Sequence, residues 1–322
     1  MQVTLQQAVD RLKNGEVVAI PTETVYGLAA DATNDAALSQ IYAIKQRPAD
    51  NPLIVHIADT DAVLNWAAEF SPLAQKLAQA FWPGPLTLVL PARQSVSTIV
   101  RGNQPTVALR IPSHPLALQI LKESGLALAA PSANKFTQLS PTTAAHVTAG
   151  LGKSIAVIDG GACTVGIEST IVSVSGDNWQ LLRLGMVIEA EIQKVTGKPA
   201  LTEAVNRLPK SPGQHLLHYS PVTPISLFNS RKALMHYARN SKTSSAALLI
   251  ESEEYAVERE TMPESCPYVV LSGHATLAAQ QFYSALHQLD QLKVAQLLIE
   301  LPPNNAQWVA ILDRLTRAAY NS

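Results

Sequence analysis

The sequence predicts an α/β protein of two domains. Its 322 residues exceed a typical domain of roughly 100–150 residues. Short apolar, β-branched runs alternate with segments of helical periodicity, and several predicted strands follow directly upon one another, which indicates a mixed sheet. The alternation breaks down between about 198 and 225, where prolines replace any apolar period. We therefore expect domains at 1–200 and 225–322, joined by a Pro-rich linker at 201–224.

The first domain begins with a predicted helix over 4–14. Thr4 and Gln7 have capping-box spacing, apolar residues recur at helical intervals, and Gly15 stands where a left-handed residue ends helices. The short β-branched run 17–20, stopped by Pro21, is typical of a buried strand. Further helices are expected near 35–46, 72–81, 115–123, 141–149 and 189–196. Further strands are expected near 53–57, 86–91, 106–111, 126–130, 155–159, 169–174 and 179–184.

The same alternation resumes after the linker and predicts a smaller, Rossmann-like α/β domain. Its strands are expected at 225–228, 246–250, 268–271 and 295–300, and its helices near 276–288 and 305–320. No constellation of residues in this domain indicates what it binds.

Composition restricts the function classes. Apolar residues make up 47% and charged residues 15%, which is typical of a globular protein. The 24 basic and 25 acidic residues divide evenly between the two halves of the chain, so no bulk charge favours nucleic acid or an anionic membrane. No apolar run reaches the ~18 residues that span a bilayer, and we expect neither a signal peptide nor an anchor. An anionic ligand must be held by a few placed cations.

Several common sites are disfavoured. Cys163 and Cys266 cannot form a disulfide framework, which favours a reducing cytoplasm; Cys163 alone could be reactive or inert. His215 and His218 lack a third ligand, so no zinc or other protein-held metal is expected. The segment 150–154 resembles a phosphate loop but follows a predicted helix and lacks the first glycine, so we interpret it as a helix end.

Polar residues gather where predicted strands and helices end. Lys45 and Arg47 close the second helix, which by itself favours two solvated cations that complement the helix dipole. The turn 131–134 presents a hydroxyl and an amide beyond a strand, where α/β sheets bind ligands, and Arg110 closes another strand. His56 within the strand 53–57 is either an isolated core histidine or a site residue. Together these residues favour an anion site over the dipole interpretation.

These segments resemble the YrdC-like family of threonylcarbamoyl-AMP synthases. The resemblance covers roughly residues 5–200 and lies in motifs that follow one another in the family order. They are Ile20–Leu28, Ile44–Pro48 with Asn51–Leu53, Trp82–Thr87, Arg110–Pro112, Pro131–Asn134 and Gly166–Thr170. Beyond them, His218–Pro221, Glu300 and Arg314–Leu315 are similar to the longer, two-domain members.

The resemblance implies condensation of L-threonine, bicarbonate and ATP into threonylcarbamoyl-AMP and pyrophosphate, for the threonylcarbamoyladenosine modification of tRNA. It implies a catalytic set of Lys45, Arg47, Ser132 and Asn134. It implies threonine contacts at Thr24, His56, Arg110, the backbone of Ala130 and Ser169. It implies ATP contacts at Arg47, Asn51, Thr106, Ser132, Ser140, Arg183 and Tyr219. Mg²⁺ is expected with ATP. Thr24, Ser140 and Ser169 could instead be turn or cap residues, and Tyr219 could be packing.

Other interpretations stay open. A YrdC-like domain could be a non-catalytic module that binds double-stranded RNA or tRNA, although the balanced charge argues against tight binding. Carbamoyl transfer is disfavoured because the chain lacks Cys/His-rich zinc-finger segments. The linker could place Tyr219 over the site as a lid. The C-terminal domain could fix the linker, mediate dimerisation or recruit the downstream threonylcarbamoyl transferase complex.

Overall fold

The computed structural model describes residues 1–201, 219–252 and 262–320, which form two compact units. Among these residues, the first unit holds Met1–Phe136, Ser140–Thr164 and 168–201. The second unit holds Thr137–Leu139, Val165–Ile167 and the described residues from 219 onward. No described helix is long and apolar enough to cross a membrane.

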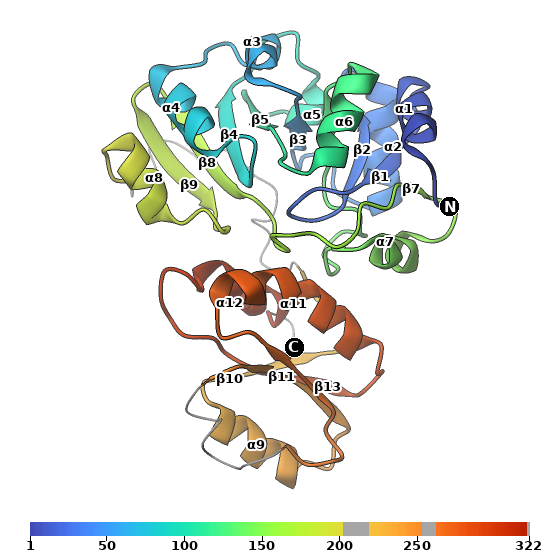
Figure 1. The fold of residues 1–322 in the computed structure, drawn as a ribbon, viewed down its shortest axis with the longest axis vertical. Helices are drawn as coiled ribbons and strands as arrows, with labels where there is room; N and C mark the ends of the chain where they lie inside the picture. The colour runs from blue at the N-terminus through green and yellow to red at the C-terminus, as the bar shows by residue number, and fades with distance from the viewer. Residues whose placement is uncertain (202–218, 253–261, 321–322) are drawn as a thin grey trace. The chain divides into compact units, whose positions relative to one another are not determined.

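The first unit is built on one mixed sheet in the order β7-β1-β2-β6-β3-β5-β4-β8-β9 (Figure 1). Its strands are β1 (Val18–Ile20), β2 (Gly27–Asp31), β3 (Ile54–His56), β4 (Leu86–Pro91), β5 (Thr106–Arg110), β6 (Leu128–Ala129), β7 (Ala156–Val157), β8 (Thr170–Ser175) and β9 (Asn178–Arg183). The pairs β1–β7, β3–β5 and β4–β8 are parallel and the other neighbours are antiparallel. The predicted mixed sheet is therefore confirmed.

Most helices of this unit begin after a residue whose side chain caps them. Thr4 forms the expected capping box, and Ser71 caps a helix that starts with Pro72. The helices are α1 (Leu5–Lys13), α2 (Asp35–Lys45), η1 (Thr60–Ala62), α3 (Val63–Trp66), α4 (Pro72–Phe81), α5 (Thr98–Arg101), α6 (Pro115–Ser124), α7 (Ala144–Leu151) and α8 (Glu189–Thr196). Helix α7 begins at Ala144 rather than near 141 because the Thr143 side chain accepts from the His146 N–H.

Two features of this unit differ from the expectation. The sequence does not predict strand β2, because its residues Gly-Leu-Ala-Ala-Asp have weak strand propensity; antiparallel pairing with β1 and β6 and burial in the core override that propensity. It does not predict the short elements η1, α3 and α5 either, since three or four residues are too few to show a helical period.

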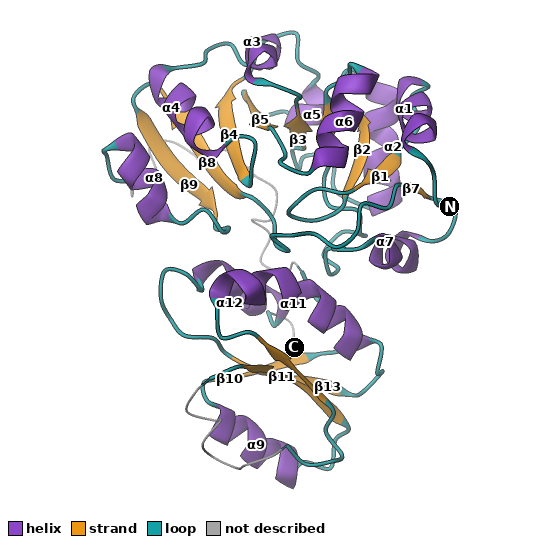
Figure 2. Ribbon diagram, in the orientation of Figure 1, coloured by secondary structure: helices purple, strands orange, loops and turns teal. Residues whose placement is uncertain are grey.

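The second unit contains a four-stranded sheet in the order β10-β13-β11-β12, and every pair in it is parallel (Figure 2). The strands are β10 (Ile225–Phe228), β11 (Ser245–Ile250), β12 (Tyr268–Leu271) and β13 (Gln296–Glu300). The described helices are α9 (Arg231–Asn240), α11 (Ala275–Asp290) and α12 (Val309–Ala318). This arrangement confirms the Rossmann-like expectation. Helix α9 is an addition to it; Ser230 caps this helix, and Leu234, Met235 and Ala238 bury its apolar stripe.

Candidate functional site

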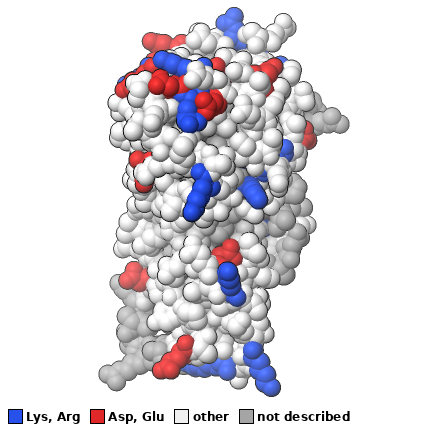
Figure 3. Space-filling model, turned by 90° about the vertical axis from the view of Figure 1, so that its right-hand side faces the viewer, with Lys and Arg blue, Asp and Glu red and all other residues white. Residues whose placement is uncertain are grey.

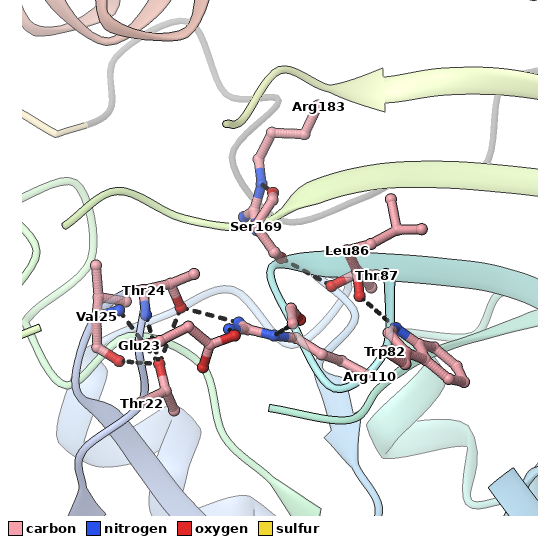
Figure 4. Close-up of polar contacts among 11 residues, drawn as sticks. Thr22, Glu23, Thr24, Val25, Trp82, Leu86, Thr87, Arg110, Ser169 and Arg183 are labelled. Atoms are coloured by element: carbon pink, nitrogen blue, oxygen red, sulfur yellow. Dashed lines mark hydrogen bonds and ion pairs between the residues drawn. The ribbon is translucent and has the colours of Figure 1, made fainter. Parts of the chain in front are cut away.

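A buried arginine lies at the end of strand β5. The Arg110 Nη2 atom is 2.6 Å from the Glu23 Oε1 atom, and both side chains are at most 4% exposed. Its Nη1 donates to the Thr24 hydroxyl at 2.9 Å and its Nε to the Gly84 carbonyl at 3.2 Å (Figure 4). Burial alone would raise the pKa of Glu23, but the Arg110 charge and hydrogen bond hold it below its ordinary value. The guanidinium is therefore fixed on three sides and charge-balanced.

The loop that supplies Glu23 and Thr24 is organised by Thr22. Pro21 follows strand β1, and the Thr22 hydroxyl then accepts from the backbone N–H groups of Thr24 and Val25, each at 3.2 Å. The same hydroxyl donates to the Val25 carbonyl at 2.6 Å. Such a hydroxyl-stabilised turn aims the two following side chains in a defined direction. Both point toward Arg110 in Figure 4.

His56 lies beside Arg110 because strands β3 and β5 are parallel and place the two residues opposite one another. The imidazole is 2% exposed. Burial, followed by the Arg110 charge, lowers the pKa of His56 to about 3, while Glu23 acts in the opposite direction. The ring is therefore neutral at physiological pH, and it is a neighbour of the site rather than an isolated core histidine.

Stability should depend on pH through His56. The unfolded chain binds a proton at this residue below about pH 6.5, whereas the folded protein does so only near pH 3. The free energy of unfolding should therefore decrease as the pH is lowered through this window, by up to ~1.4 kcal/mol per pH unit. Urea denaturation at pH 7, 6 and 5 measures this slope. His56→Asn should flatten it, and His236→Asn, an exposed control, should not. An equal slope in wild type and His56→Asn contradicts the assignment.

Lys45 and Arg47 are buried together. Gln46 ends helix α2 in the left-handed conformation (φ 53°) and is exposed, so its two neighbours turn inward, with 1% and 8% exposure. Burial, then the Arg47 charge, places the pKa of Lys45 well below its ordinary value, and Glu168 opposes this. The interpretation of both residues as solvated cations at a helix end is wrong, because the protein encloses them.

Lys45 holds the turn 131–134. Its ammonium donates to the carbonyl oxygens of Ser132 and, at 2.6 Å, Asn134. The same turn is bound to strand β2, since the Leu28 N–H donates to the Pro131 carbonyl at 2.7 Å. Ser132 is half-buried and Asn134 is 4% exposed. The predicted Lys-x-Arg and Ser-x-Asn elements are thus in direct contact.

A second polar group lies at the start of strand β8. The Ser169 hydroxyl is 2.7 Å from the Thr87 hydroxyl, and Arg183, at the end of β9, donates to the Ser169 hydroxyl and carbonyl, each at 3.0 Å (Figure 4). One residue earlier, Glu168 accepts from the buried Ser140 hydroxyl at 2.6 Å. The structure therefore joins Ser169 with Arg183, and Ser140 with Glu168, by direct hydrogen bonds.

The remaining predicted residues lie elsewhere. The Asn51 carbonyl accepts from Tyr42, and Arg47 donates to the neighbouring Pro52 carbonyl at 3.2 Å. Thr106 begins strand β5, about 13 Å along the strand from Arg110. Tyr219 belongs to the second unit and is 1% exposed; its ring centroid is 5.0 Å from the Arg314 Cζ atom. Its place over a nucleotide stays a prediction.

Two buried carboxylates beside the predicted site residues have no role in the sequence-based expectation. Glu23 and Glu168 stand inside quoted motifs without an assigned role, yet they are 3% and 6% exposed. No local pattern indicates their burial, because Glu23 follows the end of a predicted strand at Pro21 and Glu168 precedes one. A buried carboxylate requires a partner. That partner is Arg110 for Glu23, and Ser140 for Glu168.

The structure decides whether Cys163 is reactive or inert, and whether residues 150–154 form a phosphate loop or a helix end. Cys163 is 2% exposed, and burial raises the pKa of its thiol to about 12, which is the inert case. Cys163 and Cys266 are both free and buried. Gly152 ends helix α7, so this segment is a helix end, as expected.

Comparisons with known proteins identify the family of the chain. A model of the Sua5, YciO and YrdC family, described as telomere recombination, matches residues 10–185, and a model of the threonylcarbamoyl-AMP synthase C-terminal domain matches 187–320. The chain is 38% identical to a threonylcarbamoyl-AMP synthase of Bacillus subtilis, over 98% of this chain and 92% of the relative. It is 35% identical to one of Pyrococcus abyssi, over 96% and 92%.

A solved structure of P. abyssi Sua5 complexed with L-threonine has a TM-score of 0.87 at 32% identity, over 99% of this chain and 96% of that one. Both halves of the chain are thus matched by family models and by full-length relatives. The chain belongs to the threonylcarbamoyl-AMP synthase family, in its two-domain form.

Proposed function

We propose that this enzyme is a nucleotidyltransferase that condenses L-threonine, bicarbonate and ATP into threonylcarbamoyl-AMP and pyrophosphate. One chain of contacts supports the proposal most strongly. Lys45 binds the turn 131–134, the preceding Ala130 N–H donates to the Ile54 carbonyl of β3 at 3.1 Å, and β3 ends at His56 opposite Arg110. The buried pair Lys45 and Arg47, suited to phosphates, is therefore linked through the sheet to the single buried cation Arg110, suited to a carboxylate.

The chemistry requires this separation of cations. The threonine amine and bicarbonate form a carbamate with loss of water; a carbamate oxygen then attacks the α-phosphorus, and the bond from that phosphorus to pyrophosphate breaks. Two anions must approach one another, and fixed cations remove the repulsion. Lys45 and Arg47 would hold the phosphates, while Ser132 and Asn134 would contact phosphate or the acyl group. Arg110 would pair with the threonine carboxylate through the guanidinium N–H groups that Glu23, Thr24 and Gly84 do not use.

The surrounding polar groups would complete each subsite. Thr24, the neutral His56, the Ala130 backbone and Ser169 would surround threonine, and the complex of P. abyssi Sua5 with L-threonine supports that ligand. Asn51, Thr106, Ser140, Arg183 and Tyr219 would complete the nucleotide site together with Arg47 and Ser132. Among these residues, Arg183 contacts Ser169 directly and so would connect the two subsites.

Mg²⁺ would come with ATP. No three His, Cys, Asp or Glu side chains group as metal ligands among the described residues, and this ion usually takes substrate phosphates and one or two carboxylates. Glu168 would be a carboxylate ligand of the ion, because it is buried and its charge acts on the pKa of Lys45. When bound, the ion would neutralise charge on the phosphates. The chain's own residues would orient the nucleotide and exclude water.

ATP affinity should weaken as pH rises through the lowered pKa of Lys45. The ammonium attracts phosphate only while protonated, and burial makes the folded protein release this proton at a lower pH than an ordinary lysine, whose pKa is near 10.5. Titration calorimetry of ATP binding at a series of pH values below 10.5 measures the effect. Lys45→Arg, which stays charged over this range, should bind ATP with little pH dependence. Parallel profiles for the two proteins contradict this role.

The direct test of the reaction is incubation of the pure protein with ATP, bicarbonate and labelled threonine, followed by chromatography of the adenylate. A labelled nucleotide that depends on all three substrates supports the proposal, and its absence contradicts it. A salt series of tRNA binding tests the RNA-binding alternative. Acidic and basic side chains are interspersed on the face in Figure 3, so we expect weak tRNA binding there.

The proposed product would be the donor for threonylcarbamoyladenosine in tRNA, used by a downstream transferase complex in the cytoplasm. The alignment with a threonylcarbamoyl-AMP synthase of Vibrio vulnificus covers 49% of this chain and 86% of that relative. The reaction would thus require only one of the two domains. This leaves the role of the other domain to be explained from its own structure.

A further inference from the structure

The second unit contains a cavity of about 1030 Å³ at the carboxyl ends of its parallel strands. All four strand ends contribute to its lining. The contributing residues include Asn229 after β10, Glu251 and Ser252 after β11, Gly273 and His274 after β12, and Glu300 to Asn304 from the end of β13 onward. The volume suits a ligand of nucleotide size.

The topology explains why a crevice opens here. Strands β10 and β13 are neighbours, but the helices that follow them, α9 and α12, lie on opposite faces of the sheet (Figures 1 and 2). Side chains of α9 pack with Ala247, Leu249 and Leu298 of one face. Adjacent strands whose connections leave in opposite directions form a switch point, where open α/β sheets bind ligands.

Glu300 supplies a polar group to this cavity. Its Oε2 atom accepts from the Arg231 Nε at 3.1 Å, the Arg231 Nη2 at 2.8 Å and the Ile250 N–H at 2.9 Å. No described residue donates to its other oxygen, Oε1, although the residue is only 7% exposed. The Oε1 atom is not fully enclosed by the protein, and Glu300 lines the cavity, so this oxygen is open to a donor from a ligand there.

The start of helix α11 adjoins the cavity, because its N-cap residue His274 lines it. No described side chain caps this sixteen-residue helix, so the first N–H groups are available to an anion. Beside it, the Gly273 N–H donates to the Glu251 carboxylate at 3.3 Å, and a Cβ on Gly273 would lie 2.7 Å from the Glu251 carbonyl oxygen. Glycine thus allows the loops after β11 and β12 to approach closely.

We propose that this cavity is a ribonucleotide-binding site, separate from the catalytic one. A ligand must offer donors to two carboxylates and acceptors to a helix N-terminus, which a purely anionic molecule cannot do. A ribose diol would donate to Glu300 and Glu251, and the 5′-phosphate would lie at the start of α11. The site is independent of the reaction proposed above, because none of its residues belongs to the first unit.

Photolabelling of the full-length protein with 8-azido-AMP, followed by peptide mapping, tests the site directly. We expect labelled peptides from the strand ends of the second unit in addition to any from the catalytic site. Glu251→Gln should weaken this C-terminal labelling about 10–100-fold, since it removes a charge-assisted hydrogen bond. Glu264→Gln, an exposed control in the same unit, should leave it unchanged. Glu300→Gln would also disturb Arg231, so the exposed Glu251 is the variant to interpret.

Competition with unlabelled nucleotides identifies the recognised groups. AMP should displace the C-terminal label, and 2′,3′-dideoxy-AMP should do so at least about tenfold less well, since it lacks the hydroxyl donors. The proposal is overturned by labelling restricted to the first unit, by equal competition from the dideoxy analogue, or by equal labelling of Glu251→Gln and wild type. Synthesis of the adenylate in the same preparations is a separate readout, so loss of one activity does not imply loss of the other.

Discussion

Lys45→Ala and Arg47→Ala should each lower kcat on the order of 10²–10³-fold. Both cations are enclosed by protein, where a fixed charge stabilises developing phosphate charge far more than it does in water. The measurement is pyrophosphate release at saturating ATP, threonine and bicarbonate. A role limited to ground-state binding of ATP would instead raise KM and leave kcat unchanged.

Stability must be followed in the same variants. Loss of the Lys45 ammonium leaves the buried Asn134 carbonyl and the half-buried Ser132 carbonyl without this donor, which costs roughly 1–3 kcal/mol for the buried group. Rates are therefore compared per folded molecule, with the unfolding free energy measured in parallel. Lys122→Ala and Arg93→Ala remove exposed cations outside the site and should be neutral in both respects. A normal kcat with reduced stability would assign Lys45 a purely structural role.

Local patterns in the sequence are sufficient to predict most of the fold. Ser71 and Pro72 mark the start of α4, and the bounds 72–81 and 189–196 agree with the structure because cap and period coincide there. Strand β2 escapes prediction for the opposite reason. Its local composition is weakly informative, and pairing with β1 and β6 determines its structure. Helix α9 does carry a local signal, the Ser230 cap and an apolar stripe, which the expectation does not include.

The types of residue at the site are predictable from the sequence and from the family resemblance. The contacts that pair these side chains with one another are not. The ion pair of Glu23 with Arg110 joins a loop after β1 to the end of β5, and no local spacing encodes such a contact. The burial of Lys45 and Arg47 depends on one left-handed residue, Gln46, and a non-glycine residue in that conformation leaves little trace in a sequence.

Arg110→Ala should weaken threonine binding by ~1.5–3 kcal/mol, or roughly 10–100-fold, with little change in ATP affinity. The same variant should also lose ~3–5 kcal/mol of stability, because Glu23 would be left as a buried, uncompensated carboxylate. Threonine and ATP dissociation constants from calorimetry, together with urea denaturation, separate the two effects. Equal loss of affinity for both ligands contradicts the assignment of Arg110 to threonine.

The double variant Glu23→Gln, Arg110→Met decides between a binding role and a structural one. It removes both charges, so most of the lost stability should return, since replacing both members of a buried pair is far less costly than removing one. Threonine affinity should stay low, because no guanidinium faces its carboxylate. If threonine affinity returned together with stability, Arg110 would act only by holding the loop of Glu23 and Thr24 in place, and the carboxylate would have to be bound by another cation.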